Sequence, residues 1–169
     1  MKKLVSFVIV LVLFVSIVPL QSLAVNCQYS TTQSFLDYLD MKNVRYTWQG
    51  LDSDDDEKIE VTYTGDNMET IRTVWYFDNN PVRVGVRVWN IINFSVKDYY
   101  YVLEAVNNVN ADYRYIKFYV DTTDNTVTAK FDMPISATNA GELCYDILQR
   151  TINIVDDVYA ELSEYDMAS

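Results

Sequence analysis

The stretch IRTVWYFDNNPVRVGVRVWN, residues 71–90, decides the fold of this chain. Mostly apolar residues occupy every second position of 71–77 and again of 82–88, which is the period of a β-strand with one buried face. The link Asn79-Asn80-Pro81 consists of turn residues and is short, so the two strands are expected to be antiparallel neighbours. The stretch therefore predicts two paired strands of an antiparallel sheet.

The segments on either side extend this pattern into an α+β fold. Two more alternating runs and a helical spacing of apolar residues precede it, and a helix, a hairpin and a long helix follow. The order α-β-β-β-β-α-β-β-α, with one polar face on each strand, indicates an antiparallel sheet with helices packed on one face. The predicted elements are helix 32–42, strands 44–49, 59–64, 71–77 and 82–89, helix 96–108 with Ser95 as its cap, strands 114–120 and 127–131, and helix 139–164.

Residues 1–24 have the features of a secretory signal peptide. A pair of lysines precedes an uncharged apolar run, and Pro19 and a small-residue cleavage motif, Ser22-Leu23-Ala24, follow it. We expect cleavage, a single domain over 25–169, and export to the cell envelope or the extracellular space. The alternative is an uncleaved segment that anchors the protein in the membrane.

The composition excludes several classes of function. Asp plus Glu number 24, Lys plus Arg number 13, and there is no histidine. The missing imidazole removes Ser-His-Asp and Cys-His catalysis and His-ligated metal sites, and a formal net charge of −11 argues against a nucleic-acid partner. The four glycines lie too far apart for a phosphate-binding loop or a dinucleotide fingerprint. We therefore expect no cofactor, no metal and no nucleic acid.

The densest run of charge is Asp52-Ser53-Asp54-Asp55-Asp56-Glu57. Its aspartates fit the opening ligand positions of an EF-hand, but Glu57 stands where that motif needs Gly and Tyr63 where it needs Glu. We interpret the run as a solvated loop between strands, with weak cation binding as the alternative. Other pairs of carboxylates would allow acid–base catalysis, but none forms a recognisable motif.

The two cysteines, Cys27 and Cys144, leave two arrangements open. In an exported protein they can form a disulfide that ties the N-terminal arm to the last helix. Alternatively, Cys27 is a loose exposed thiol and Cys144 is a small core residue of that helix. Spacing along the chain does not decide between the two, because it says nothing about neighbourhood in space.

The polar sides of the strands carry a set of aromatic and basic residues on an otherwise acidic protein. Tyr, Trp and Arg are the residue types in which the binding energy of protein interfaces is concentrated. The alternative is ordinary cross-strand pairing on a solvated sheet. The candidate partner-binding residues are Arg72, Tyr76, Arg83, Arg87, Trp89, Tyr115, Lys117 and Tyr119.

A pattern of elements from Phe94 onward matches a known family. It consists of a helix with an Asn-rich exit at 103–110, a strand that ends in Asp121, a polar turn, a second strand at 127–134 and a final helix at 141–165. In these features the chain resembles the YbjN-domain family of bacterial proteins. That family looks like type III secretion chaperones in fold, which are small, acidic, commonly dimeric proteins that hold partner peptides. The resemblance implies no catalytic residue. Those chaperones act in the cytosol, whereas the predicted signal peptide indicates that this protein is exported.

Together these features predict an exported, non-catalytic, chaperone-like binding module that holds a protein or peptide partner, with a homodimer as one arrangement. Addition of a partner strand to a sheet edge is a binding mode that such a fold allows. The alternative is a cell-envelope hydrolase that uses paired carboxylates. It would need two carboxyls converging in a concave pocket, with the pKa of at least one clearly raised.

Overall fold

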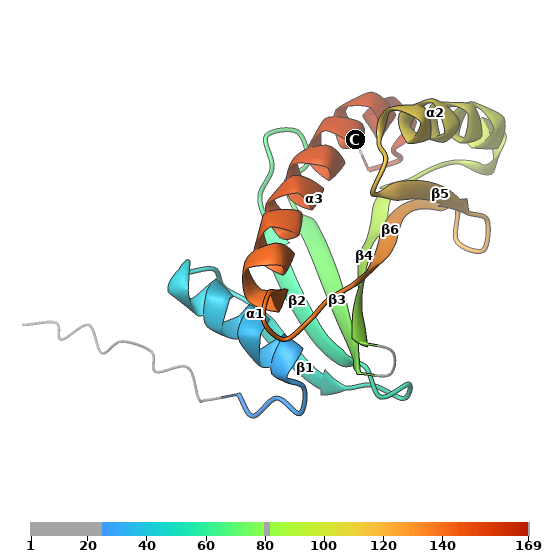
Figure 1. Ribbon diagram of the computed structural model, residues 1–169. Coiled ribbons are helices and arrows are strands. Elements are labelled where there is room, and N and C mark those ends of the chain that lie inside the picture. The colour runs from blue at the N-terminus through green and yellow to red at the C-terminus, as the bar shows by residue number, and fades with distance from the viewer. Residues whose placement is uncertain (1–24, 80–81, 169) are drawn as a thin grey trace, which may run out of the picture.

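The computed structural model describes residues 25–79 and 82–168 (Figure 1). The predicted signal peptide, 1–24, lies outside the described residues, so its cleavage and the export of the protein stay predictions. Within the described ranges, no helix is both long enough and apolar enough to span a lipid bilayer.

Six strands form one antiparallel sheet, with neighbours in the order β1-β2-β3-β4-β6-β5. The two central strands, β3 and β4, come from the 71–90 stretch, and their register places Trp75 opposite Val86 and Phe77 opposite Val84. The α+β fold and the order of elements predicted from the sequence are confirmed. The strands are β1 (Thr47–Leu51), β2 (Glu57–Tyr63), β3 (Ile71–Asn79), β4 (Val82–Asn93), β5 (Lys117–Asp121) and β6 (Thr126–Pro134).

Three helices cover one face of this sheet, as the sequence pattern predicted. The last helix, drawn in orange and red, runs from the first helix at one end of the sheet to the second helix at the other (Figure 1). Phe35 of the first helix packs against Trp75 and Phe77, with ring centroids 4.8 and 5.6 Å apart. These fully buried rings join the helical layer to the central strand. The helices are α1 (Ser30–Met41), α2 (Tyr99–Asp112) and α3 (Ala140–Leu162).

The boundaries of α2 differ from the prediction. A 3-10 turn over Val96–Asp98 precedes the helix, and Ser95 makes no side-chain hydrogen bond to it, so the predicted cap is wrong. The helix also continues past Asn107 and Asn108, which were expected to end it. Asn110 is not a terminator either, because its side chain bonds to a strand instead.

The two edges of the sheet differ in how their backbone groups are satisfied. At the β5 edge, the Asn110 amide donates to the carbonyl of Phe118 at 2.7 Å, and its oxygen accepts from the N–H of Phe118 at 2.8 Å. One side chain thus imitates a neighbouring strand. At the other edge no described strand pairs with the outer side of β1, where Trp48 and Leu51 are 36% and 43% exposed. Strand addition is therefore blocked at Phe118, whereas the outer side of β1 has no neighbour among the described strands.

Cys27 and Cys144 are both free thiols in the structure. Cys144 is fully buried on α3, and this burial raises the pKa of its thiol to about 12. Cys27 is half-buried rather than loose, and burial together with the charges of Glu57 and Asp37 raises its pKa to about 11. Both thiols are consequently protonated, weak nucleophiles at neutral pH.

Candidate binding site

The face of the sheet opposite the helices carries long polar and aromatic side chains from β2, β3, β4 and β6. The antiparallel register brings residues far apart in sequence into one row: Tyr76 lies opposite Gly85, and Gly85 lies opposite Asp132. In the next row Arg87 lies opposite Lys130. We call this surface the open face.

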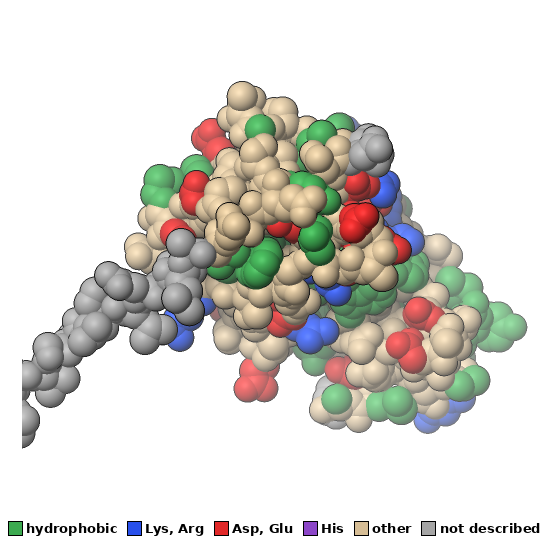
Figure 2. Space-filling model, turned by 90° about the horizontal axis from the view of Figure 1, so that it is seen from below, with side chains coloured by type: hydrophobic (Ala, Val, Ile, Leu, Met, Phe, Trp, Pro, Cys, Tyr) green, Lys and Arg blue, Asp and Glu red, His purple; other side chains and the backbone are tan. Residues whose placement is uncertain are grey.

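A hollow of about 330 Å³ lies on the open face, between the strands and the acidic loop that joins β1 to β2. Four of the candidate partner-binding residues line it: Tyr76, Arg83, Arg87 and Trp89. The loop contributes Asp52, Asp54 and Asp56 to the opposite wall. On the side of the molecule shown in Figure 2, acidic and basic side chains lie interspersed rather than in separate fields.

Gly85 forms the floor of the hollow. A Cβ atom at this position would lie 2.6 Å from Oδ1 of Asp132 and 3.3 Å from Nη1 of Arg87, so a side chain there would displace both groups. The sequence contained a signal for this, since a glycine inside a run of valines often marks the close approach of another group. Asp132, by contrast, carries no signal in the sequence that places it beside Arg87.

The guanidinium group of Arg87 contacts three hydrogen-bond acceptors and one aromatic ring. Its Nη2 donates to Oδ1 of Asp132 at 3.0 Å, and its Nη1 donates to the carbonyls of Val86 at 2.9 Å and Phe131 at 3.0 Å. Its guanidinium carbon lies 6.0 Å from the ring centroid of Tyr76. The positive charge of Arg87 is therefore already matched within the protein.

Arg83 is matched in the same way. Its Nε donates to Oδ2 of Asp78 at 3.0 Å, across the β3–β4 pair. The sequence suggested that these arginines offer positive charge to a partner, whereas the structure uses both as internal counterions. With five aspartates and two arginines in its lining, the hollow carries an excess of negative charge.

Hydrogen bonds between the side chain of Asp52 and the backbone order the acidic loop. Oδ1 of Asp52 accepts hydrogen bonds from the N–H groups of Asp54 and Asp56, at 2.9 and 3.1 Å. Burial raises the pKa of Asp56, and the charges of Asp78, Asp52 and Asp54 raise it further against an opposing effect of Arg83. The pKa of Asp56 is thus raised first by burial, and the neighbouring aspartates add to that shift.

Glu57 does not belong to the solvated loop, which corrects the prediction. Its side chain is 1% exposed, and its carboxylate accepts from the backbone N–H groups of Gln28 at 2.6 Å and Tyr29 at 3.1 Å. The hydroxyl of Tyr29 in turn donates to the carbonyl of Asp55 at 2.7 Å. Glu57 therefore fastens the segment before α1 to the start of β2.

The other candidate partner-binding residues lie outside the hollow. Arg72 is on the open face beside Glu60, at 3.9 Å, and Tyr119 lies under the ammonium group of Lys130, 4.5 Å from its ring centroid. The ammonium group of Lys117 donates to the carbonyls of Asn110, at 2.7 Å, and of Tyr113, at the end of α2. Tyr115 precedes β5 and lies on the helical side, where it is 76% exposed.

Clusters of acidic and cysteine side chains were compared with the geometry that a metal ion needs. Among residues 25–79 and 82–168, no group of three or more Cys, Asp or Glu side chains is arranged to hold a metal ion. The EF-hand comparison made from the sequence had already failed at two of its positions. The hollow is a polar surface lined by five aspartates, two arginines and the aromatic side chains of Tyr76 and Trp89.

Comparison with known protein families matches residues 46–164 to the YbjN family, described as "Putative bacterial sensory transduction regulator". Among solved structures, the crystal structure of YbjN from E. coli is similar to this chain at 10% sequence identity. That match covers 76% of this chain and 88% of the other, with a TM-score of 0.44. A comparison with curated proteins finds no match.

Proposed function

The chain belongs to the YbjN family, and from this premise we propose that it is a non-catalytic binding module whose hollow holds a basic segment of a protein or peptide partner. The description of the family as a regulator, and not as an enzyme, is consistent with such a role. The observation that carries the proposal is the charge of the hollow. Both of its arginines form internal ion pairs, whereas its three loop aspartates form none with a described basic residue.

The chemistry of the walls defines the partner. An ammonium or guanidinium group placed beside Asp54 and Asp56 would meet carboxylates that form no ion pair with a described basic residue. The same group, or a neighbouring aromatic side chain, would stack on Trp89, which is 38% exposed at the rim. A partner segment that alternates basic and aromatic residues fits both walls. The open edge of β1 supports an extended conformation for a bound segment, or pairing with a second copy of the chain.

Titration calorimetry with two synthetic peptides tests the charge argument. One peptide alternates Arg and Tyr, and the other carries Glu in place of each Arg. We expect binding of the first peptide only, with an affinity that falls as salt is added. Equal binding of both peptides would contradict the proposal.

Matched variants locate the site. The double variant Asp54→Asn with Asp56→Asn is expected to weaken binding of the basic peptide about tenfold, and Trp89→Ala to cost about 1 kcal/mol or more. The control, Glu69→Gln with Asp157→Asn, changes the net charge equally at two exposed positions away from the hollow. A similar loss in the control would mean that overall charge and not the hollow drives binding.

The pKa of Asp56 adds a second readout. Because this pKa is raised, part of the negative charge of the hollow develops above the ordinary range of an aspartate. Affinity for the basic peptide should therefore increase as the pH rises through the pKa of Asp56. In Asp56→Asn this increase should be absent.

A cell-envelope hydrolase is the second candidate function, and one observation favours it. The hollow is concave, contains several carboxyls and raises the pKa of Asp56, which is the environment of a general acid. Hydrolysis of envelope glycans by the purified protein, lost in both Asp56→Asn and Asp78→Asn, would establish it. Binding of the basic peptide without turnover would leave the binding module as the function.

A further inference from the structure

A second cavity, of about 340 Å³, lies on the helical side of the sheet. It exists because β5 is shorter than β6: the two pair only over 126–130, so the last part of β6 lacks a neighbour. On the inward side of β6, Val127 and Ala129 are fully buried, whereas Phe131 and Met133 are only half-buried. The layer thus leaves apolar side chains incompletely covered at this end.

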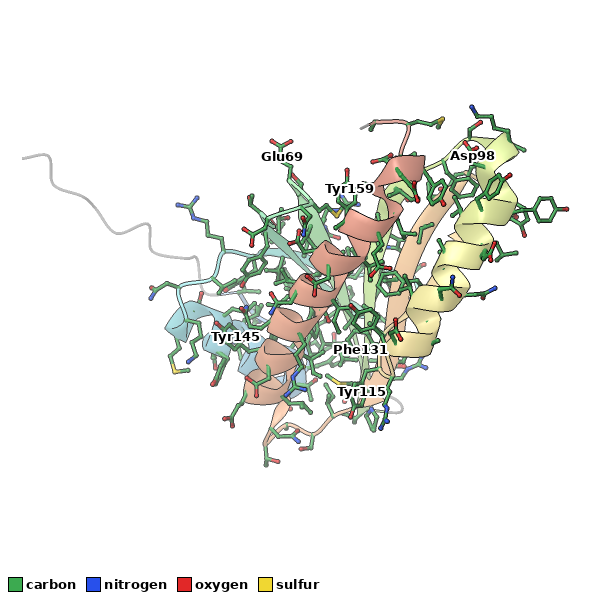
Figure 3. The ribbon with its side chains drawn as sticks, turned by 90° about the horizontal axis from the view of Figure 1, so that it is seen from above. Glu69, Asp98, Tyr115, Phe131, Tyr145 and Tyr159 are labelled. Carbon is green, nitrogen blue, oxygen red and sulfur yellow. The ribbon has the colours of Figure 1, made fainter. Side chains whose placement is uncertain are left out.

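The cavity has three mainly apolar walls, with Thr151 and Asn153 as polar members of the α3 wall. β6 supplies Phe131 and Met133, and the segment before β5 supplies Tyr115 and Ile116. The third wall is a stripe of α3 formed by Ile147, Thr151 and Ile154, one step around the helix from the core stripe that contains Leu148. Figure 3 shows Phe131 and Tyr115 on the helical side of the sheet, between α3 and the end of α2.

Two charged residues, Asp132 and Arg150, lie at the rim of the cavity, and only one of them already has an ion-pair partner among the described residues. Asp132 is bonded to Arg87 at 3.0 Å, so its charge is compensated. Arg150 forms no ion pair or hydrogen bond with any described residue, although Asp146 lies one turn before it on α3. The rim of this apolar cavity therefore presents one unmatched guanidinium group on a strongly acidic protein.

We propose that this cavity binds a single-chain amphiphile of the fatty-acid class, with its alkyl chain between β6 and α3 and its carboxylate on Arg150. The volume falls at the lower end of the range for small-ligand pockets, and such pockets combine apolar walls with a few polar groups that fix orientation. A guanidinium group binds a carboxylate with two parallel hydrogen bonds. The half-buried Met133 adds an adaptable wall for a flexible chain. This site lies on the opposite side of the sheet from the hollow, and the two share only Asp132 among the residues that line them.

Comparing two ligands on two proteins separates the contribution of the ligand's carboxylate to binding from that of its alkyl chain. Dodecanoate and dodecanol, both below their aggregation limits, are titrated into the wild-type protein and into Arg150→Gln. We expect the wild type to bind dodecanoate about tenfold more tightly than dodecanol. In Arg150→Gln that preference should vanish while dodecanol binding is unchanged. All proteins carry the same residues 1–24, so any binding to that apolar segment is a constant background. Arg72→Gln, on the opposite face, is the control and should retain the preference.

A larger side chain that fills the cavity tests whether the alkyl chain of the ligand binds there. Met133→Trp should abolish binding of both ligands with an unchanged thermal midpoint. If that variant fails to fold, Ile154→Glu serves instead, because the position is half-buried and a carboxylate there would repel dodecanoate. Undiminished binding in a folded cavity variant would overturn the proposal, and so would a preference for dodecanoate that survives in Arg150→Gln. Failure of both amphiphiles to bind the wild type would also overturn it and would leave an apolar side chain of a protein partner as the occupant to test.

Discussion

The carboxylate of Asp156 on α3 occupies the space that a side chain at Gly65 would need. A Cβ atom at Gly65 would overlap Oδ1 of Asp156. The glycine lets the β2–β3 turn close around that carboxylate, which accepts from the backbone N–H groups of Asp66, Asn67 and Met68 at 3.0, 3.0 and 2.8 Å. The last helix is thereby locked to a turn some ninety residues earlier in the chain.

Removal of this carboxylate should destabilise the protein. In Asp156→Ala three backbone N–H groups lose their acceptor at a site where Asp156 is only 8% exposed, so we expect a loss of about 2–3 kcal/mol in the free energy of unfolding. Urea denaturation followed by circular dichroism measures it. The neighbouring exposed residue supplies the control: Asp157→Ala should change stability by less than about 0.5 kcal/mol. Equal effects of the two variants would show that the turn contact contributes nothing.

The same contact predicts a pH dependence. Burial alone would raise the pKa of Asp156, but the hydrogen bonds from Met68, Asn67 and Asp66 outweigh it and hold the pKa below its ordinary value of 3.8. The unfolded chain therefore takes up the proton first as the pH falls, so the stabilisation is complete above pH 3.8 and is lost below it. The difference in unfolding free energy between wild type and Asp156→Asn should shrink when urea titrations are repeated below that pH. A constant difference would contradict the lowered pKa.

Asn110 is predicted to protect the β5 edge. Asn110→Ala leaves the N–H and the carbonyl of Phe118 without their partner, at a cost of about 1–3 kcal/mol. It also exposes an edge strand that can pair with another chain. We expect a lower thermal midpoint and concentration-dependent association in analytical ultracentrifugation. Asn107→Ala, at an exposed position on the same helix, should show neither effect.

The thiols are predicted to be free and slow to react. Since the pKa values of Cys27 and Cys144 are raised to about 11 and about 12, alkylation by iodoacetamide at pH 8 should be slow for the folded protein. After unfolding in guanidinium without reductant, both cysteines should be alkylated, as read by intact mass. A mass without any alkylation would instead establish the disulfide.

Export is predicted from residues 1–24 and is checked at the N-terminus. Protein recovered from outside the cytoplasm should begin near Val25 when its N-terminal peptide is sequenced. An intact Met1 in the membrane fraction would support the anchor, and an intact Met1 in the cytosol would contradict both alternatives.

The sequence by itself determined the order of strands and helices, and which side of the central strands faces the core. It placed the first strand at 44–49 and the fifth at 114–120, whereas β1 is Thr47–Leu51 and β5 is Lys117–Asp121. Strict alternation also fails in β1, where the register shifts between Trp48 and Gly50. The alternation in 71–90 and the apolar stripe of the last helix are local periodicities, and burial of one face is enough to specify them. The C-terminal end of α2 was missed because the local signal of an asparagine as a terminator competed with a tertiary hydrogen bond from Asn110 to Phe118.

Only the tertiary structure decided which polar groups meet. A period of two assigns Arg87 to the open face, but its pairing with Asp132 depends on the β4–β6 register, which long-range packing determines. The same holds for Glu57 and Asp156, which the sequence presents as two acidic residues among 24 and which the fold buries against backbone N–H groups. The physical reason is that hydrophobic periodicity is encoded locally, whereas the compensation of a charge depends on neighbours that only the folded chain brings within hydrogen-bonding distance.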